Sequence, residues 1–130
     1  MIKTKSVSSP IDRENDGLRI LVTRSLVRYL PKERYDVWMA NLGPSEALLD
    51  QWRERTIAWK EFEMRYRAEL LEGGSIDERN QRIKNHGQKF TLRLLQRLGE
   101  LGNVTLLCHC GEEERQCHRH LLQQELGGKF

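Results

Sequence analysis

The sequence predicts an α/β fold, a small three-layer sandwich with a largely parallel sheet of three to five strands flanked by helices. Short β-branched and aliphatic runs alternate along the chain with longer segments whose apolar residues recur every three or four positions. The 130 residues are 38% hydrophobic and 32% charged, which is enough apolar material for one core. We therefore expect residues 1–130 to form a single domain.

Four segments have the composition of strands. Ile2–Val7 alternates apolar with polar residues, which predicts a strand with one solvated face, whereas Leu18–Val22 is more fully apolar and predicts a central strand. Tyr35–Met39 predicts a third, short strand, and Val104–Leu107 predicts a buried one. Because helical segments separate these runs, the strands are expected to pair in parallel.

Helical periodicity is clearest in the middle of the chain. Ser45 is a predicted N-cap, opening a helix with Leu48, Leu49 and Trp52. The next helix is expected from about residue 56 to 71, with four large residues on its core face, Trp59, Phe62, Tyr66 and Leu70. We expect these aromatic residues to belong to the core and not to form a base-stacking platform.

The last two helices follow from capping and periodicity. Ser75-Ile76-Asp77-Glu78 has the pattern of a capping box, and the helix it opens is expected to break near Gly87 and to continue from Gln88 to about Leu98. Phe90, Leu94 and Leu98 are predicted to face the core. A final helix is expected to begin at Cys117.

Composition limits the class of protein. A net charge of +3 permits acidic partners such as nucleotides or nucleic acid, but it is weaker than the basic footprint of a dedicated nucleic-acid binder. No apolar run is long enough to span a membrane, and the N-terminus lacks the apolar segment of a signal peptide. We expect a cytoplasmic protein whose three cysteines are thiols, thiolates or metal ligands.

The residues with reactive or metal-binding side chains are concentrated between Val104 and His120. These residues include all three cysteines and three of the four histidines of the chain. They connect a predicted strand to a predicted helix, and ligands in open α/β sheets bind at that end of a strand. This connection is therefore the predicted functional site.

A zinc site is one hypothesis, because thiolate and imidazole groups are the ligands that zinc prefers. Cys117 and His120 are three positions apart and share a helix face. Cys108 and Cys110 can reach the same ion only if the chain leaves the strand at His109. The predicted ligand set is Cys108, Cys110, Cys117 and His120.

A cysteine nucleophile is the second hypothesis. Cys117 would lie near a helix N-terminus, which lowers a thiol pKa, with His118 as its base. Three carboxylates in the same loop, Glu112-Glu113-Glu114, oppose this effect, and the alternative account of them is that they cap the helix. The alternative is structural: Cys108 would be a small buried apolar residue, and His118 would bind a backbone carbonyl.

Arginines near the same sheet edge suggest an anion site. Arg24 and Arg28 follow the predicted central strand, and Arg119 follows Cys117 closely, so the three can converge on one anion. Salt bridges to surface carboxylates are the alternative. A basic stripe on the residue 88–98 helix is expected to be a solvated face.

Four blocks of the sequence resemble the YeaO-like family, also called domain of unknown function 488. They are Asp16-Gly17-Leu18-Arg19-Ile20-Leu21-Val22 with Arg24, Gly43-Pro44-Ser45 with Trp52, Trp59-x-x-Phe62-x-x-x-Tyr66-x-x-Glu69-Leu70, and Val104-Thr105-Leu106-Leu107-Cys108 leading to Cys117-His118-Arg119. The resemblance implies an α/β fold and supplies no reaction. The chain departs from the family pattern in the extra His109, Cys110 and His120. It also has Arg24-Ser25-Leu26-Val27-Arg28 where the family has Arg-x-x-Pro-Arg.

These observations favour a protein that binds a phosphorylated ligand, a nucleotide or nucleic acid at the C-terminal edge of its sheet. Arg24, Arg28 and Arg119 would supply positive charge, and Cys108 would line the pocket. Two alternatives remain from other classes: a cysteine-dependent enzyme using Cys117 with His118, and a zinc-stabilised interaction module.

Overall fold

A four-stranded, all-parallel sheet lies at the centre of the computed structural model, which describes residues 1–26, 29–72 and 87–128. The strands are β1 (Ile2–Ser6), β2 (Leu18–Leu21), β3 (Val37–Trp38) and β4 (Val104–Cys108), arranged in the order β1-β4-β2-β3. The predicted α/β fold and parallel sheet are confirmed. Each strand begins and ends within one residue of the predicted positions, except β3, which is shorter than predicted.

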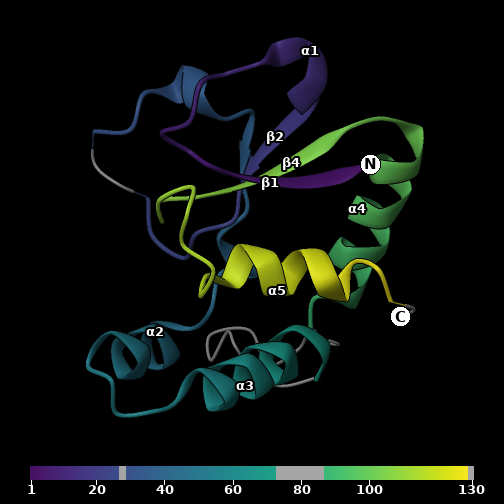
Figure 1. Cartoon of the computed structure of the whole chain (residues 1–130). Coiled ribbons are helices and arrows are strands. Elements are labelled where there is room, and N and C mark those ends of the chain that lie inside the picture. The colour runs from purple at the N-terminus through teal and green to yellow at the C-terminus, as the bar shows by residue number, and fades with distance from the viewer. Residues whose placement is uncertain (27–28, 73–86, 129–130) are drawn as a thin grey trace.

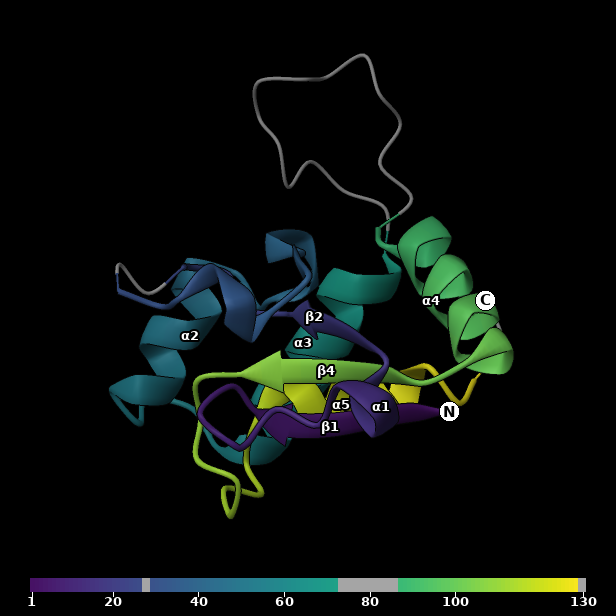
Figure 2. The same ribbon diagram turned by 90° about the horizontal axis from the view of Figure 1, so that it is seen from above.

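The register of the strands brings their carboxyl ends to one edge. Ser6 lies opposite Cys108, and Leu21 lies opposite Leu107. The backbone extends this pairing, since the Val22 N–H donates to the Leu107 carbonyl at 2.9 Å. The segments that follow β1, β2 and β4 therefore leave the sheet at the same edge (Figure 2). The segment after β4 consists of residues 109–117.

Helices cover one face of the sheet (Figure 1). Helix α5 (His118–Glu125) packs on β1 and β4, and α3 (Trp59–Leu71) packs on the other side of α5. Helix α2 (Glu46–Arg53) lies beside α3, and α4 (Lys89–Leu101) contacts β4. Ser45 caps α2 as predicted, its side chain accepting from the Leu48 N–H at 3.3 Å.

The apolar core lies between this face and the helices. Residues Ile20 and Leu106 of the two central strands are fully buried there, together with the α3 side chains Phe62, Tyr66 and Leu70. The predicted inward face of α3 is thus confirmed for these three residues. Trp59 is only partly buried and packs against the edge of the core.

The opposite face of the sheet is covered mainly by polar contacts. The short helix α1 (Arg13–Asp16) lies over it, and the buried Asp16 carboxylate pairs with Arg19 and, at 3.1 Å, with Lys5. The Thr105 hydroxyl donates to the Asp16 carbonyl at 2.7 Å. A smaller apolar cluster of Val7, Leu21 and Leu107 completes this face.

The predicted core face of α4 is confirmed for Leu98, which is partly buried against the core, and is wrong for Phe90 and Leu94. Phe90 and Leu94 are 67% and 53% exposed, while Leu92 and Leu95 are fully buried. Leucines occupy both sides of this helix, so periodicity does not determine which side packs. Gly99 decides it: a Cβ there would lie 2.7 Å from Ile2 Cγ1, so α4 approaches β1 through its smallest residue.

Two further predictions have a simple outcome. The Ser75–Glu78 capping box lies outside the described residues. Within the part of the chain that is described, no helix is long and apolar enough to cross a membrane.

Candidate functional site

A cavity of about 300 Å³ lies at the carboxyl ends of β2 and β4. Its floor comes from the strand ends and from the start of α5, and its wall comes from α2 and α3. This is the edge at which ligands bind in open α/β sheets. The residues lining it include all three cysteines and His118.

Three donor groups meet at the floor of the cavity. The sulfurs of Cys108 and Cys117 and a ring nitrogen of His118 all lie within 4.8 Å of one another, and all three residues are buried. The Cys110 sulfur lies 3.9 Å from that of Cys108 but is half-buried. The chain leaves β4 at Cys108, which lets Cys108 and Cys110 approach one another as the zinc hypothesis required.

The tautomer of His118 follows from its hydrogen bond. Its Nε2 lies 2.7 Å from the Val22 carbonyl oxygen, which can only accept, so Nε2 carries a proton. Burial lowers the pKa of His118, so the ring is neutral near pH 7. Nδ1 then carries a lone pair, and it lies 3.9 Å from the Cys108 sulfur.

Cys108 is the thiol that its surroundings favour as a thiolate. Interaction with the Cys110 and Cys117 thiols lowers the pKa of Cys108 to about 3, and the Cys110 backbone and the charge of Arg119 act in the same direction, while burial opposes them. The same coupling to Cys108 raises the pKa of Cys110 and of Cys117. This contact raises the pKa of Cys117, the predicted nucleophile, and so opposes its ionisation.

Arg119 is buried and binds backbone. Its guanidinium donates to the carbonyls of Cys110 at 3.0 Å, Gly111 at 2.9 Å and Glu112 at 3.4 Å. It does not line the cavity. The predicted anion ligand instead holds the loop that carries Cys110 and places a positive charge beside Cys108.

The acidic loop is turned away from the thiols. The Glu112 carboxylate accepts from the Ser6 N–H and the Ser9 hydroxyl, both at 2.6 Å, at the end of β1. Burial opposes ionisation, but these two bonds lower the pKa of Glu112. The Glu114 carboxylate accepts from the Gln116 N–H at 3.0 Å, directly before Cys117, which is the N-cap of α5 and makes no side-chain capping bond.

A family model described as "Active DUF488-N3 subclade" matches residues 2–129 of the chain. The chain belongs to the DUF488-N3a family. This agrees with the resemblance seen in the sequence motifs, and it extends over almost the whole chain. Comparison with curated proteins and with solved structures gives no significant match.

In this DUF488-N3a protein, Arg24 lines the cavity as predicted. Its Nε and Nη2 donate to the carbonyls of Pro44 at 3.0 Å and Gly43 at 2.6 Å, which fixes the guanidinium at the cavity wall. A Cβ at Gly43 would clash with the Arg24 backbone, so glycine permits this approach. Arg28 lies outside the described residues.

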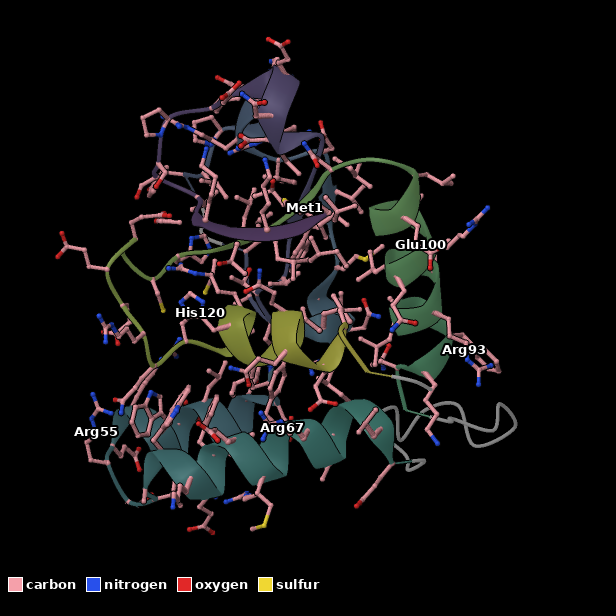
Figure 3. The ribbon with its side chains drawn as sticks, turned by 45° about the vertical axis from the view of Figure 1, so that its right-hand side comes forward. Met1, Arg55, Arg67, Arg93, Glu100 and His120 are labelled. Atoms are coloured by element: carbon pink, nitrogen blue, oxygen red, sulfur yellow. The ribbon has the colours of Figure 1, made fainter. Side chains whose placement is uncertain are left out.

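His120 does not join the cysteines. Its Nε2 lies 3.0 Å from the Glu114 carbonyl, and its Nδ1 lies 3.5 Å from the Thr4 hydroxyl (Figure 3). His118 occupies the position among the sulfurs that helical spacing assigned to His120. The reason is that Cys117 is the N-cap, with extended backbone, so helical spacing does not apply to it.

Several lining residues of the DUF488-N3a cavity were not identified from the sequence as site residues. Trp52 and Trp59 are partly buried and form part of the wall, so they contribute both to the core edge and to the cavity. Thr23 is only 6% exposed, and its hydroxyl has no hydrogen-bond partner among the described residues. Its place directly after the central strand was the available signal.

Proposed function

We propose that this protein binds a small phosphorylated ligand with a planar group, of the nucleotide class, in the cavity at the carboxyl edge of its sheet. The observation that carries the proposal is the composition of the lining. An aromatic and aliphatic wall faces a polar floor, and the cationic side chains in it are two arginines. No carboxylate lines the cavity among the described residues.

The apolar wall suits a planar ring. Trp52, Trp59 and Phe62 form a contiguous cluster, with ring centroids 5.1 Å apart for the two tryptophans and 4.9 Å apart for Trp59 and Phe62. Aromatic side chains bind nucleobases through stacking, which is sequence-tolerant and worth about 1–3 kcal/mol for each base. Such a cluster at the wall of a cavity provides that surface.

The polar groups suit an anion. Arg24 and Arg53 line the same cavity and are the kind of donors that bind phosphate. The Thr23 hydroxyl is buried and has no partner in the described part of the chain, and a buried polar group is normally satisfied. A ligand oxygen would satisfy it. A cavity of about 300 Å³ is at the small end of ligand sites, which favours a single nucleotide over a polymer.

Isothermal titration calorimetry with a nucleoside 5′-monophosphate tests the proposal, with free nucleoside and inorganic phosphate in separate titrations. We expect the nucleotide to bind more tightly than either part. Arg53→Gln, on the exposed surface of α2, is expected to weaken nucleotide binding by about tenfold because a charged contact is lost. Arg97→Gln is the matched control, since Arg97 pairs with Glu100 on α4.

The location of the ligand has its own readout. Nucleotide bound in the cavity is expected to protect the half-buried Cys110 thiol from iodoacetamide. Equal loss of affinity in Arg53→Gln and Arg97→Gln, or full labelling of Cys110 at saturating nucleotide, would contradict binding in this cavity.

A further inference from the structure

We propose that Cys108, Cys117 and His118 form a site for one transition-metal ion of the zinc class, with its remaining coordination position facing the cavity. The three donor atoms lie within 4.8 Å of one another. In a tetrahedral site with metal–ligand distances of about 2.0–2.3 Å, ligand atoms are about 3.3–3.8 Å apart. The Cys108 sulfur and His118 Nδ1, at 3.9 Å, are already near that separation.

The imidazole is oriented as a metal ligand requires. Metal-binding histidines donate their second ring N–H to a carboxylate or a carbonyl, which fixes the tautomer and the ring plane. His118 does this with the Val22 carbonyl, and Val22 is itself bonded to the end of β4 through Leu107. The free Nδ1 is thus held toward the sulfurs by the sheet.

The charge of the site also suits a metal ion. Two thiolates, one neutral imidazole and a divalent ion sum to zero charge, which suits residues that are 4%, 3% and 6% exposed.

Neither of the remaining candidates completes the set. Cys110 contacts Cys108 at 3.9 Å, but it is half-buried and does not belong to the group of mutually close donors. His120 is bonded to Glu114 and Thr4. Sites with three protein ligands and one open position are typical of catalytic zinc, whereas structural sites are closed by four. All three proposed ligands line the cavity, so the open position faces it.

Metal binding by the full chain provides the test. Protein purified without a metal-binding tag and treated with chelator is titrated with Zn²⁺ and, separately, with Co²⁺. We expect one ion per chain and a Co²⁺ spectrum with thiolate charge-transfer bands for two sulfurs. Cys108→Ser and Cys117→Ser are expected to lower affinity by about 100-fold or more, since loss of an outer contact alone costs 10–100-fold.

His120→Ala is the matched control, an imidazole beside the site that is bonded to Glu114 and Thr4. This variant is expected to retain affinity and the two-thiolate spectrum. Absence of bound ion in the wild type, or loss of the ion in the control as complete as in Cys108→Ser, would overturn the proposal. Circular dichroism of each chelated variant checks folding, and the wild-type titration decides the matter if a variant does not fold.

This inference does not depend on the proposed nucleotide. Zn²⁺ is titrated without nucleotide, and the nucleotide titration is repeated in chelator, so each proposal succeeds or fails by its own measurement.

Discussion

Two arginines at the edge of the sheet bind backbone carbonyls, although their charge suggests ligand binding. Arg119 donates to three consecutive carbonyls of residues 110–112, and Arg24 donates to those of residues 43 and 44. Each bond satisfies a loop carbonyl, and each loop carries or borders the cavity. These arginines therefore hold the loops beside the cavity in place and also supply positive charge there.

Arg119→Ala is expected to destabilise the fold by about 1–3 kcal/mol, because buried acceptors lose their donors and packing volume is lost. Urea unfolding followed by circular dichroism measures this change. Arg115→Ala, at an exposed position of the same loop, is the control and should change the free energy of unfolding little. Equal effects of the two substitutions would contradict a special role for the Arg119 contacts.

Thr23→Val separates stability from binding at one atom. The Thr23 hydroxyl is buried and bonds none of the residues that the structure describes, so its replacement by a methyl group of similar size should leave stability within about 1 kcal/mol of wild type or raise it. If the hydroxyl binds the ligand, nucleotide affinity should fall by about tenfold. Thermal unfolding and calorimetry of the same variant test both effects, and unchanged affinity would exclude Thr23 from the binding site.

Helix α2 is the element that brings the tryptophan wall to the cavity. Its start is fixed by Ser45, whose hydroxyl and N–H both donate to the Glu69 carboxylate of α3, at 2.6 and 2.8 Å. Leu49 and Trp52, one and two turns further along α2, line the cavity. A cap at the start of one helix, tied to a second helix, thus sets the position of the wall.

Ser45→Ala is expected to cost about 1 kcal/mol from the lost cap, and more if Glu69 is left without its partner. Because α2 carries the wall, nucleotide binding should weaken together with stability. Ser25→Ala, at an exposed serine outside the helices, is the control for urea unfolding. A Ser45→Ala variant with wild-type stability would show that the cap is dispensable.

The two faces of the sheet are covered differently. Helices with apolar side chains cover one face, and a polar layer with a buried cluster of ion pairs covers the other. Asp16 is buried and pairs with Arg19 and Lys5, linking α1 to β2 and β1. Burial alone would raise the pKa of Asp16, but the Asp12 N–H, Lys5 and Arg19 outweigh it and lower the pKa. The second face is therefore stabilised by charge where the first is stabilised by apolar area.

A lowered pKa makes the stability from Asp16 depend on pH. The contribution is fully present above the pKa of an unfolded aspartate, about 3.9, and is lost as pH falls through the lower folded pKa. Asp16→Asn is expected to cost about 3 kcal/mol at pH 7, where it leaves two cations unpaired. The difference from wild type should shrink below about pH 4. A difference that stays constant with pH would contradict this account.

Local sequence was enough to predict the four strands, most of the helices and the segment that contains the three cysteines. Leu18–Leu21 and Val104–Cys108 are short apolar runs whose local composition permits little else, and the α3 periodicity identified Phe62, Tyr66 and Leu70 as core. Local propensity and apolar period are properties of neighbouring residues, so they can be read without the fold.

Which side chains of the candidate site contact one another depends on the tertiary structure. His118 and not His120 lies among the sulfurs, because Cys117 caps α5 instead of belonging to it, and because Val22 of a distant strand holds the imidazole. The buried face of α4 likewise depended on the contact between Gly99 and Ile2. These outcomes rest on contacts between residues far apart in the chain, which neither spacing nor periodicity encodes.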